Sequence, residues 1–132
     1  MSKRRVLIVD DTQATTDLTA FVLNAAAFAV QSATDAASAI LQVQLFKPDL
    51  ILMDVQMPGV DGLELTRRLK ADPSTRHIVV VAFTAFAMRG DETRMRAAGC
   101  DGYISKPFDV ASFAKTVHSY IQASAASDTD ET

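Results

Sequence analysis

The sequence predicts an α/β fold in which five parallel strands form one sheet with helices on both faces. Short runs of Val, Ile and Leu alternate with amphipathic segments, in the order strand then helix, repeated five times. Alternation of this kind produces a doubly wound sheet with right-handed crossovers. A length of 132 residues suits one such domain and leaves no room for a second catalytic or DNA-binding domain.

The strands are predicted from continuous apolar runs. Residues 6–9, 50–53 and 78–83 contain no polar side chain and are rich in Val, Ile and Leu. Such runs are typical of strands that are buried on both faces of a parallel sheet. Residues 29–33 and 103–104 give weaker strand patterns, and they complete the expected set of five.

Two helices show a clear apolar stripe. Leu18, Phe21, Val22 and Ala25 recur at i, i+3, i+4 and i+7, and Val110, Phe113, Val117 and Ile121 line one face of the last helix. Residues at this spacing share one helix face. We therefore expect both sets to face the core.

Capping residues indicate where helices begin and end. Asp35 and Asp109 can cap helix starts, the second helix closes at Lys47 and Pro48, and the third closes at Pro73. Gly99 suits a left-handed C-terminal cap. Residues 1–121 are expected to form the domain, and residues 122–132, which are small, polar and acidic, are expected to be disordered.

Composition excludes several classes of protein. Thirteen Lys and Arg against sixteen Asp and Glu give a net charge of -3, with no basic stripe that would bind nucleic acid. The single cysteine, Cys100, cannot form an internal disulfide and fits a reducing compartment. The apolar runs are too short to span a membrane. A cytoplasmic protein is expected.

Chemistry-bearing residues stand at the ends of the predicted strands. Asp10 and Asp11 follow the first strand, Asp54 follows the third, Thr84 follows the fourth, and Lys106 with Pro107 follows the fifth. Each residue alone is better explained as a turn, a cap or solvated surface. The predicted fold changes that interpretation, because the carboxyl ends of parallel strands meet at one edge of the sheet, where ligands bind.

Three carboxylates at one edge would repel one another unless a cation lay between them. Magnesium is bound by one or two carboxylates, waters and phosphate oxygens, so Asp10, Asp11 and Asp54 predict a magnesium site with positions open to a phosphoryl group. Asp54 can act as the nucleophile, while Lys106 and Thr84 can contact phosphoryl oxygens. This arrangement predicts phosphoryl transfer, which depends mainly on positioning and charge stabilisation.

With these residues in place, the chain resembles the receiver domains of response regulators over residues 5–121. Thr84 lies 30 residues and Lys106 lies 52 residues after Asp54, as in that family. The motifs that carry the resemblance are Val9-Asp10-Asp11, the segment 53–62 (MDVQMPGVDG), Thr84-Ala85 and Ser105-Lys106-Pro107. The segment from Thr84 to Pro107 is also similar to single-domain regulators of bacterial cell-cycle and differentiation pathways.

The resemblance implies a flavodoxin-like (βα)5 sheet with strand order 2-1-3-4-5. It also implies that Asp54 is the phospho-acceptor, that Gln56 contributes its carbonyl to the magnesium site, and that Thr84 and Tyr103 form a switch. A cis peptide bond between Lys106 and Pro107 is implied as well. On residue type alone, Tyr103 is better explained as a core aromatic residue.

The function implied is a phospho-accepting receiver of a two-component system or phosphorelay. A histidine kinase or histidine phosphotransfer protein would be the donor, and an unidentified output protein would bind the face formed by the fourth helix, fifth strand and last helix. The protein would not be an enzyme beyond its own phosphorylation and dephosphorylation. Two departures from the family concern packing and rates: Phe83 is bulkier than the usual aliphatic residue, and Phe86 could shield the phosphoryl group from water.

Two alternatives belong to other classes. Magnesium-dependent phosphatases also use an aspartyl phosphate, but they resemble D-x-D after the first strand, whereas Asp10 and Asp11 are adjacent and Asp54 follows the third. A flavin or dinucleotide binder needs a Gly- or Thr-rich phosphate loop after the first strand. No G-x-G-x-x-G occurs, and Asp10-Asp11 would repel a flavin phosphate.

Overall fold

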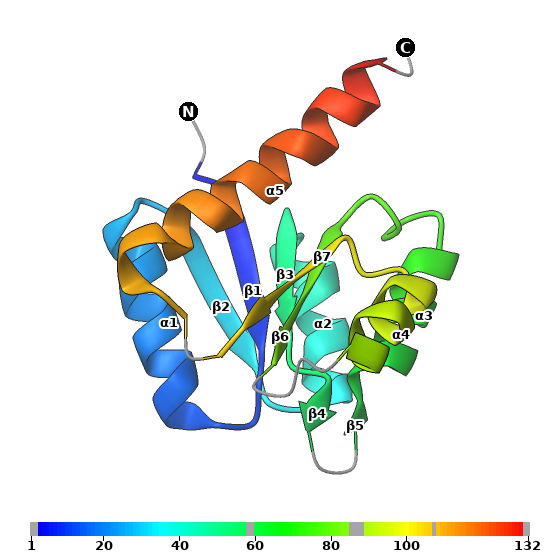
Figure 1. Cartoon of the computed structure of the whole chain (residues 1–132), viewed down its shortest axis with the longest axis horizontal. Coiled ribbons are helices and arrows are strands. Elements are labelled where there is room, and N and C mark those ends of the chain that lie inside the picture. The colour runs from blue at the N-terminus through cyan, green and yellow to red at the C-terminus, as the bar shows by residue number, and fades with distance from the viewer. Residues whose placement is uncertain (1–2, 58–59, 85–88, 107, 131–132) are drawn as a thin grey trace.

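The computed structural model describes residues 3–57, 60–84, 89–106 and 108–130 (Figure 1). The central sheet is parallel and contains β1 (Arg5–Val9), β2 (Ala29–Ala33), β3 (Leu50–Met53), β6 (Val79–Thr84) and β7 (Gly102–Ser105). Its order, β2-β1-β3-β6-β7, is the order 2-1-3-4-5 when these five strands are counted along the chain. The predicted flavodoxin-like fold is confirmed.

The helices cover both faces of this sheet. One face carries α1 (Gln13–Ala25) and α5 (Val110–Asp130), and the other carries α2 (Ala36–Phe46), α3 (Gly62–Ala71) and α4 (Arg89–Ala98). Alternate strand residues feed the two cores: Ile8 and Phe83 pack with α1 and α5, whereas Leu7 and Ala82 pack with the other three helices. This alternation follows from the period of two along a strand.

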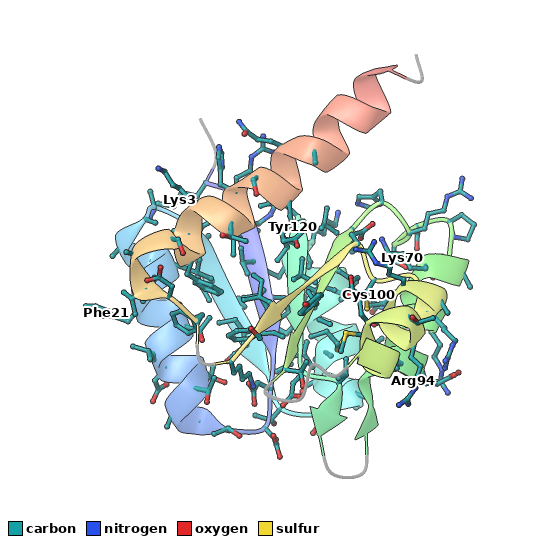
Figure 2. The ribbon with its side chains drawn as sticks, viewed as in Figure 1. Lys3, Phe21, Lys70, Arg94, Cys100 and Tyr120 are labelled. Atoms are coloured by element: carbon teal, nitrogen blue, oxygen red, sulfur yellow. The ribbon has the colours of Figure 1, made fainter. Side chains whose placement is uncertain are left out.

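The prediction that the apolar stripe of α1 faces the core is wrong for its two largest side chains, Leu18 and Phe21. Leu18 is 50% exposed and Phe21 is 72% exposed, and Phe21 points away from the sheet in Figure 2. The buried residues of α1 are Thr16, Thr19 and Leu23, with Ala20 packed beside them. This set has the same i, i+3, i+4, i+7 spacing, and burial of Thr19 is tolerated because its hydroxyl donates to the Thr15 carbonyl at 2.7 Å.

The last helix agrees better with the prediction. Phe113, Val117 and Ile121 are buried, whereas Val110 is 56% exposed. The helix continues through Asp130, so the described part of the expected disordered tail is helical. Alanines at 123, 125 and 126 explain the extension, because they favour helix and add to turns that are already formed.

The predicted caps are present. Asp35 accepts a hydrogen bond from the Ser38 amide at 2.7 Å, and Asp109 accepts one from the Ala111 amide at 3.1 Å. The second helix ends at Phe46 with Lys47 in the left-handed region at φ 53°, and Gly99 has φ 106° after α4.

Among the residues described, no helix is both long and apolar enough to span a membrane.

A small hairpin was not predicted. β4 (Gln56–Met57) and β5 (Val60–Asp61) pair antiparallel between β3 and α3. In Figure 1 the hairpin projects beyond the edge of the sheet at which β3 ends. It therefore borders the segment that carries Asp54.

Candidate functional site

The three predicted carboxylates come together at one edge of the sheet. β1 and β3 are adjacent, with Val9 paired to Met53, so Asp10 and Asp54 leave neighbouring strands side by side. The Asp54 amide donates to the Val9 carbonyl at 2.9 Å, which fixes one strand end to the other. One carboxylate oxygen from each of Asp10, Asp11 and Asp54 lies within 4.8 Å of the other two.

Burial differs among these acids. Asp10 is 1% exposed and Asp54 is 7% exposed, whereas Asp11 lies on the surface. The Oδ1 atom of Asp10 accepts the Thr12 amide at 2.9 Å, so the turn into α1 holds this carboxylate in place. The cluster therefore has a buried base and an open side toward solvent.

Lys106 reaches this cluster from the end of β7. Its amide donates to the Thr84 carbonyl at 2.9 Å, so the main chain of Lys106 is anchored to β6. Its Nζ atom lies 2.6 Å from Asp10 Oδ2 and 3.6 Å from Asp54 Oδ2. The same ammonium lies over the ring of Phe83, 5.0 Å from its centroid.

Charge balance favours a divalent cation at the cluster. Three carboxylates lie beside one ammonium, so these four side chains together carry a net charge of about -2. Burial of Asp10 and Asp54 makes that excess costly. Carboxylate oxygens at this separation are suitable ligands for magnesium, so the donor set fits the expected metal.

Thr84 and Tyr103 lie on the same face of the sheet, on adjacent strands. Thr84 ends β6 and is 1% exposed. Tyr103 pairs with Ala82, which precedes Thr84 by two residues in β6. Tyr103 is 36% exposed and lines a small recess with Glu92 and Met95 of α4. The two proposed switch residues are thus close neighbours, one at the strand end and one beside α4.

Other predicted residues are only partly described. Gln56 begins β4, two residues after Asp54, so its main chain lies next to the cluster in sequence, while its side chain lies outside the described atoms. Pro107, with the bond before it, and Phe86 also lie outside the described residues. Their predicted roles stay predictions.

Gly62 is a position whose importance the sequence analysis missed. A Cβ atom on Gly62 would lie 2.6 Å from the Asp54 carbonyl oxygen and 2.8 Å from the Val55 Cα. The first residue of α3 must therefore be glycine for the helix to begin against the main chain of the acceptor. A glycine at the start of an amphipathic helix was the signal that could have suggested this close approach.

Comparison with known proteins gives a consistent result. Residues 6–118 match the family model of the response regulator receiver domain. The chain is 43% identical over 118 residues to the polar-differentiation response regulator DivK of Brucella anthropi, covering 89% of this chain and 96% of that protein.

Solved structures agree. A response regulator from Chloroflexus aurantiacus superposes with a TM-score of 0.86 at 27% identity, covering 92% of this chain and 99% of that one. The receiver domain of a Pseudomonas aeruginosa sensor histidine kinase superposes with a TM-score of 0.82, also at 27% identity and with coverage of 92% and 99%. That structure has a magnesium ion coordinated in its active-site cleft.

Proposed function

Since the chain belongs to the family of response regulator receiver domains, we propose that it accepts a phosphoryl group on Asp54 and changes its partner binding in response. The observation that carries the proposal is the meeting of Asp54 with Asp10, Asp11 and the Lys106 ammonium at one edge of the sheet. The donor would be a histidine kinase or a histidine phosphotransfer protein, both of which carry a phosphohistidine.

In the proposed reaction, a carboxylate oxygen of Asp54 attacks the phosphorus of phosphohistidine. The new P–O bond forms as the P–N bond breaks, and the donor imidazole leaves with the electron pair and takes up a proton. Lys106 and Thr84 contact the phosphoryl oxygens and stabilise their charge. A magnesium ion held by Asp10, Asp11, Asp54 and the Gln56 carbonyl would supply further charge neutralisation.

Asp54 is suited to this role by its surroundings. It is nearly buried, which limits access of water, yet it lies beside the exposed Asp11 on the open side of the cluster. Hydrolysis of the aspartyl phosphate would then require a water molecule aligned with the P–O bond. The only dephosphorylation proposed for the protein is this loss of its own phosphoryl group. A phosphatase-type enzyme is less well supported, because the relatives are signalling regulators and its D-x-D motif does not follow β1.

The proposed output surface is the face of α4, β7 and α5. Tyr103 and Glu92 line the same small recess on it, and Tyr103 pairs with Ala82, two residues before Thr84 in β6. A partner that binds one state more tightly would shift the population toward that state. The protein would act in the cytoplasm and would not bind nucleic acid directly.

Acetyl phosphate, a small phosphoryl donor, tests the acceptor. We expect the intact mass of the protein to rise by one phosphoryl group in the presence of magnesium, and to stay unchanged when a chelator removes it. Asp54→Asn should abolish this gain in mass, whereas Asp17→Asn, at an exposed position of α1, should retain it. Equal labelling of Asp54→Asn and wild type would show that Asp54 is not the acceptor.

A further inference from the structure

The Lys106 ammonium has an aromatic neighbour as well as two acidic ones. It lies over the Phe83 ring at 5.0 Å from the centroid, while Asp10 and Asp54 lie 2.6 Å and 3.6 Å away. The face of an aromatic ring carries partial negative charge and attracts a cation within about 6 Å of its centroid. Three groups therefore define where the ammonium stands.

The Phe83 ring is held firmly. Phe83 is 0% exposed, and its ring packs against Phe108 at 5.8 Å and Phe113 at 5.6 Å between centroids. Phe108 and Phe113 stack on each other at 4.2 Å. These three rings come from β6, the segment after β7 and the first turn of α5, so the β6 ring under Lys106 is fixed by contacts from two other parts of the chain.

Lys106 needs such a fixed surface. Lysine has a long flexible side chain that can adopt many rotamers, and its nearest carboxylate here is Asp10 rather than the proposed acceptor. From its place over the ring, the ammonium lies 3.6 Å from Asp54 Oδ2. An aliphatic side chain at position 83 could fill the core but would present no π face.

We propose that Phe83 is a positioning residue, which holds the Lys106 ammonium where it can contact the phosphoryl group on Asp54. The inference rests on the proposed phosphoryl transfer and adds a residue that acts on it through Lys106. Phe83 itself lies on the α1 and α5 face, opposite the face that Thr84 shares with Tyr103.

The first test is Phe83→Leu. The phosphorylation rate with acetyl phosphate at saturating magnesium should fall by about 2- to 30-fold, which is the range expected for loss of one cation–π contact. Phe28→Leu is the matched control: Phe28 is buried in the same apolar cluster as Phe83 but is not one of the two described rings that pack against Phe83, so the rate should stay near that of wild type. Urea unfolding checks that each variant is folded at the assay temperature, and Phe83→Met replaces Phe83→Leu if the latter is not.

A double-mutant cycle separates positioning from a general packing effect. In a Lys106→Met background, Phe83→Leu should cause no further loss of rate, because the residue through which Phe83 acts is absent. The same fold-loss in both backgrounds, or a Phe83→Leu rate equal to that of wild type, would overturn the proposal. The acceptor role of Asp54 is tested separately, by labelling that wild type should show and Asp54→Asn should lose. That role can hold even if the proposed role of Phe83 fails.

Discussion

The Lys106 ammonium lies 2.6 Å from a carboxylate oxygen of Asp10, a side chain that is fully buried. This contact joins the end of β7 to the end of β1, two strands that are separated in the sheet by β3 and β6. It also gives the most buried acid of the cluster a cationic partner. Lys106 therefore has a structural part in the protein in addition to its proposed contact with the phosphoryl group.

Lys106→Met should lower the free energy of unfolding by about 3 kcal/mol in buffer with chelator, because the buried Asp10 carboxylate loses its cation. Excess magnesium should recover much of this loss, since a bound cation would neutralise the same acids. Urea unfolding with and without magnesium measures both effects, and Lys115→Met, at an exposed position of α5, is the control. An equal loss of unfolding free energy with and without magnesium would contradict the idea that Lys106 and magnesium neutralise the same carboxylates.

Asp11→Asn should weaken magnesium binding while leaving the fold intact or slightly more stable without metal, because it removes one of three mutually repelling carboxylates. A tenfold loss of affinity would reduce the stabilisation by excess magnesium by about 1.4 kcal/mol. Thermal melting across a magnesium titration reports this change. Asp17→Asn should respond to magnesium as wild type does, and an unaltered response in Asp11→Asn would remove Asp11 from the ligand set.

Gly62→Ala should displace the main chain of the acceptor. The added Cβ would meet the Asp54 carbonyl and Val55 Cα, and these backbone atoms cannot rotate away. We expect a loss of about 1–3 kcal/mol in stability together with slower phosphorylation by acetyl phosphate. Gly102→Ala is the control, because its Cβ would meet the Tyr120 side chain on α5 (Figure 2), so it should destabilise with little change in that rate.

The Cys100 thiol should react slowly at neutral pH. Burial raises its pKa, an effect that a hydrogen bond with Thr66 opposes only in part. Above the ordinary thiol pKa of 9.0, the unfolded chain loses this proton before the folded chain does, so the free energy of unfolding falls as pH rises. Cys100→Ala should remove that component of the alkaline pH dependence. Modification of the native thiol as fast as that of free cysteine would contradict its burial.

Sequence reasoning succeeded where local pattern decides the outcome. Three of the five strands, β1, β3 and β6, contain continuous apolar runs, and the acids and Lys106 lie directly at strand ends, so their meeting follows once the sheet is parallel. It failed for α1, because two residue sets have the same helical spacing and the choice between Leu18 and Thr19 depends on which face packs against the sheet. The Gly62 approach depends on where α3 docks, and the glycine at the start of that helix was only an indirect signal of it.

The last prediction concerns the proposed switch between Thr84 and Tyr103. A phosphoryl group on Asp54 adds charge and acceptor oxygens, so the Thr84 hydroxyl should be drawn toward it. Tyr103 lies on the next strand, on the same face, and is only partly exposed, beside Glu92 and Met95. Movement of Thr84 would leave space into which Tyr103 can turn, and this turn would alter the surface of α4 and β7.

Thr84→Ala should therefore leave labelling at Asp54 possible but uncouple it from that surface. Backbone amide shifts of Arg94 and Tyr103 can be followed by NMR with and without beryllofluoride, which mimics the phosphoryl group. Wild type and the control Thr116→Ala, on α5, should shift both at Asp54 and on the α4 and β7 surface, whereas Thr84→Ala should shift mainly near Asp54. Equal shifts at Arg94 and Tyr103 in all three proteins would refute the coupling through Thr84 and leave the acceptor role of Asp54 intact, because labelling at Asp54 is measured independently.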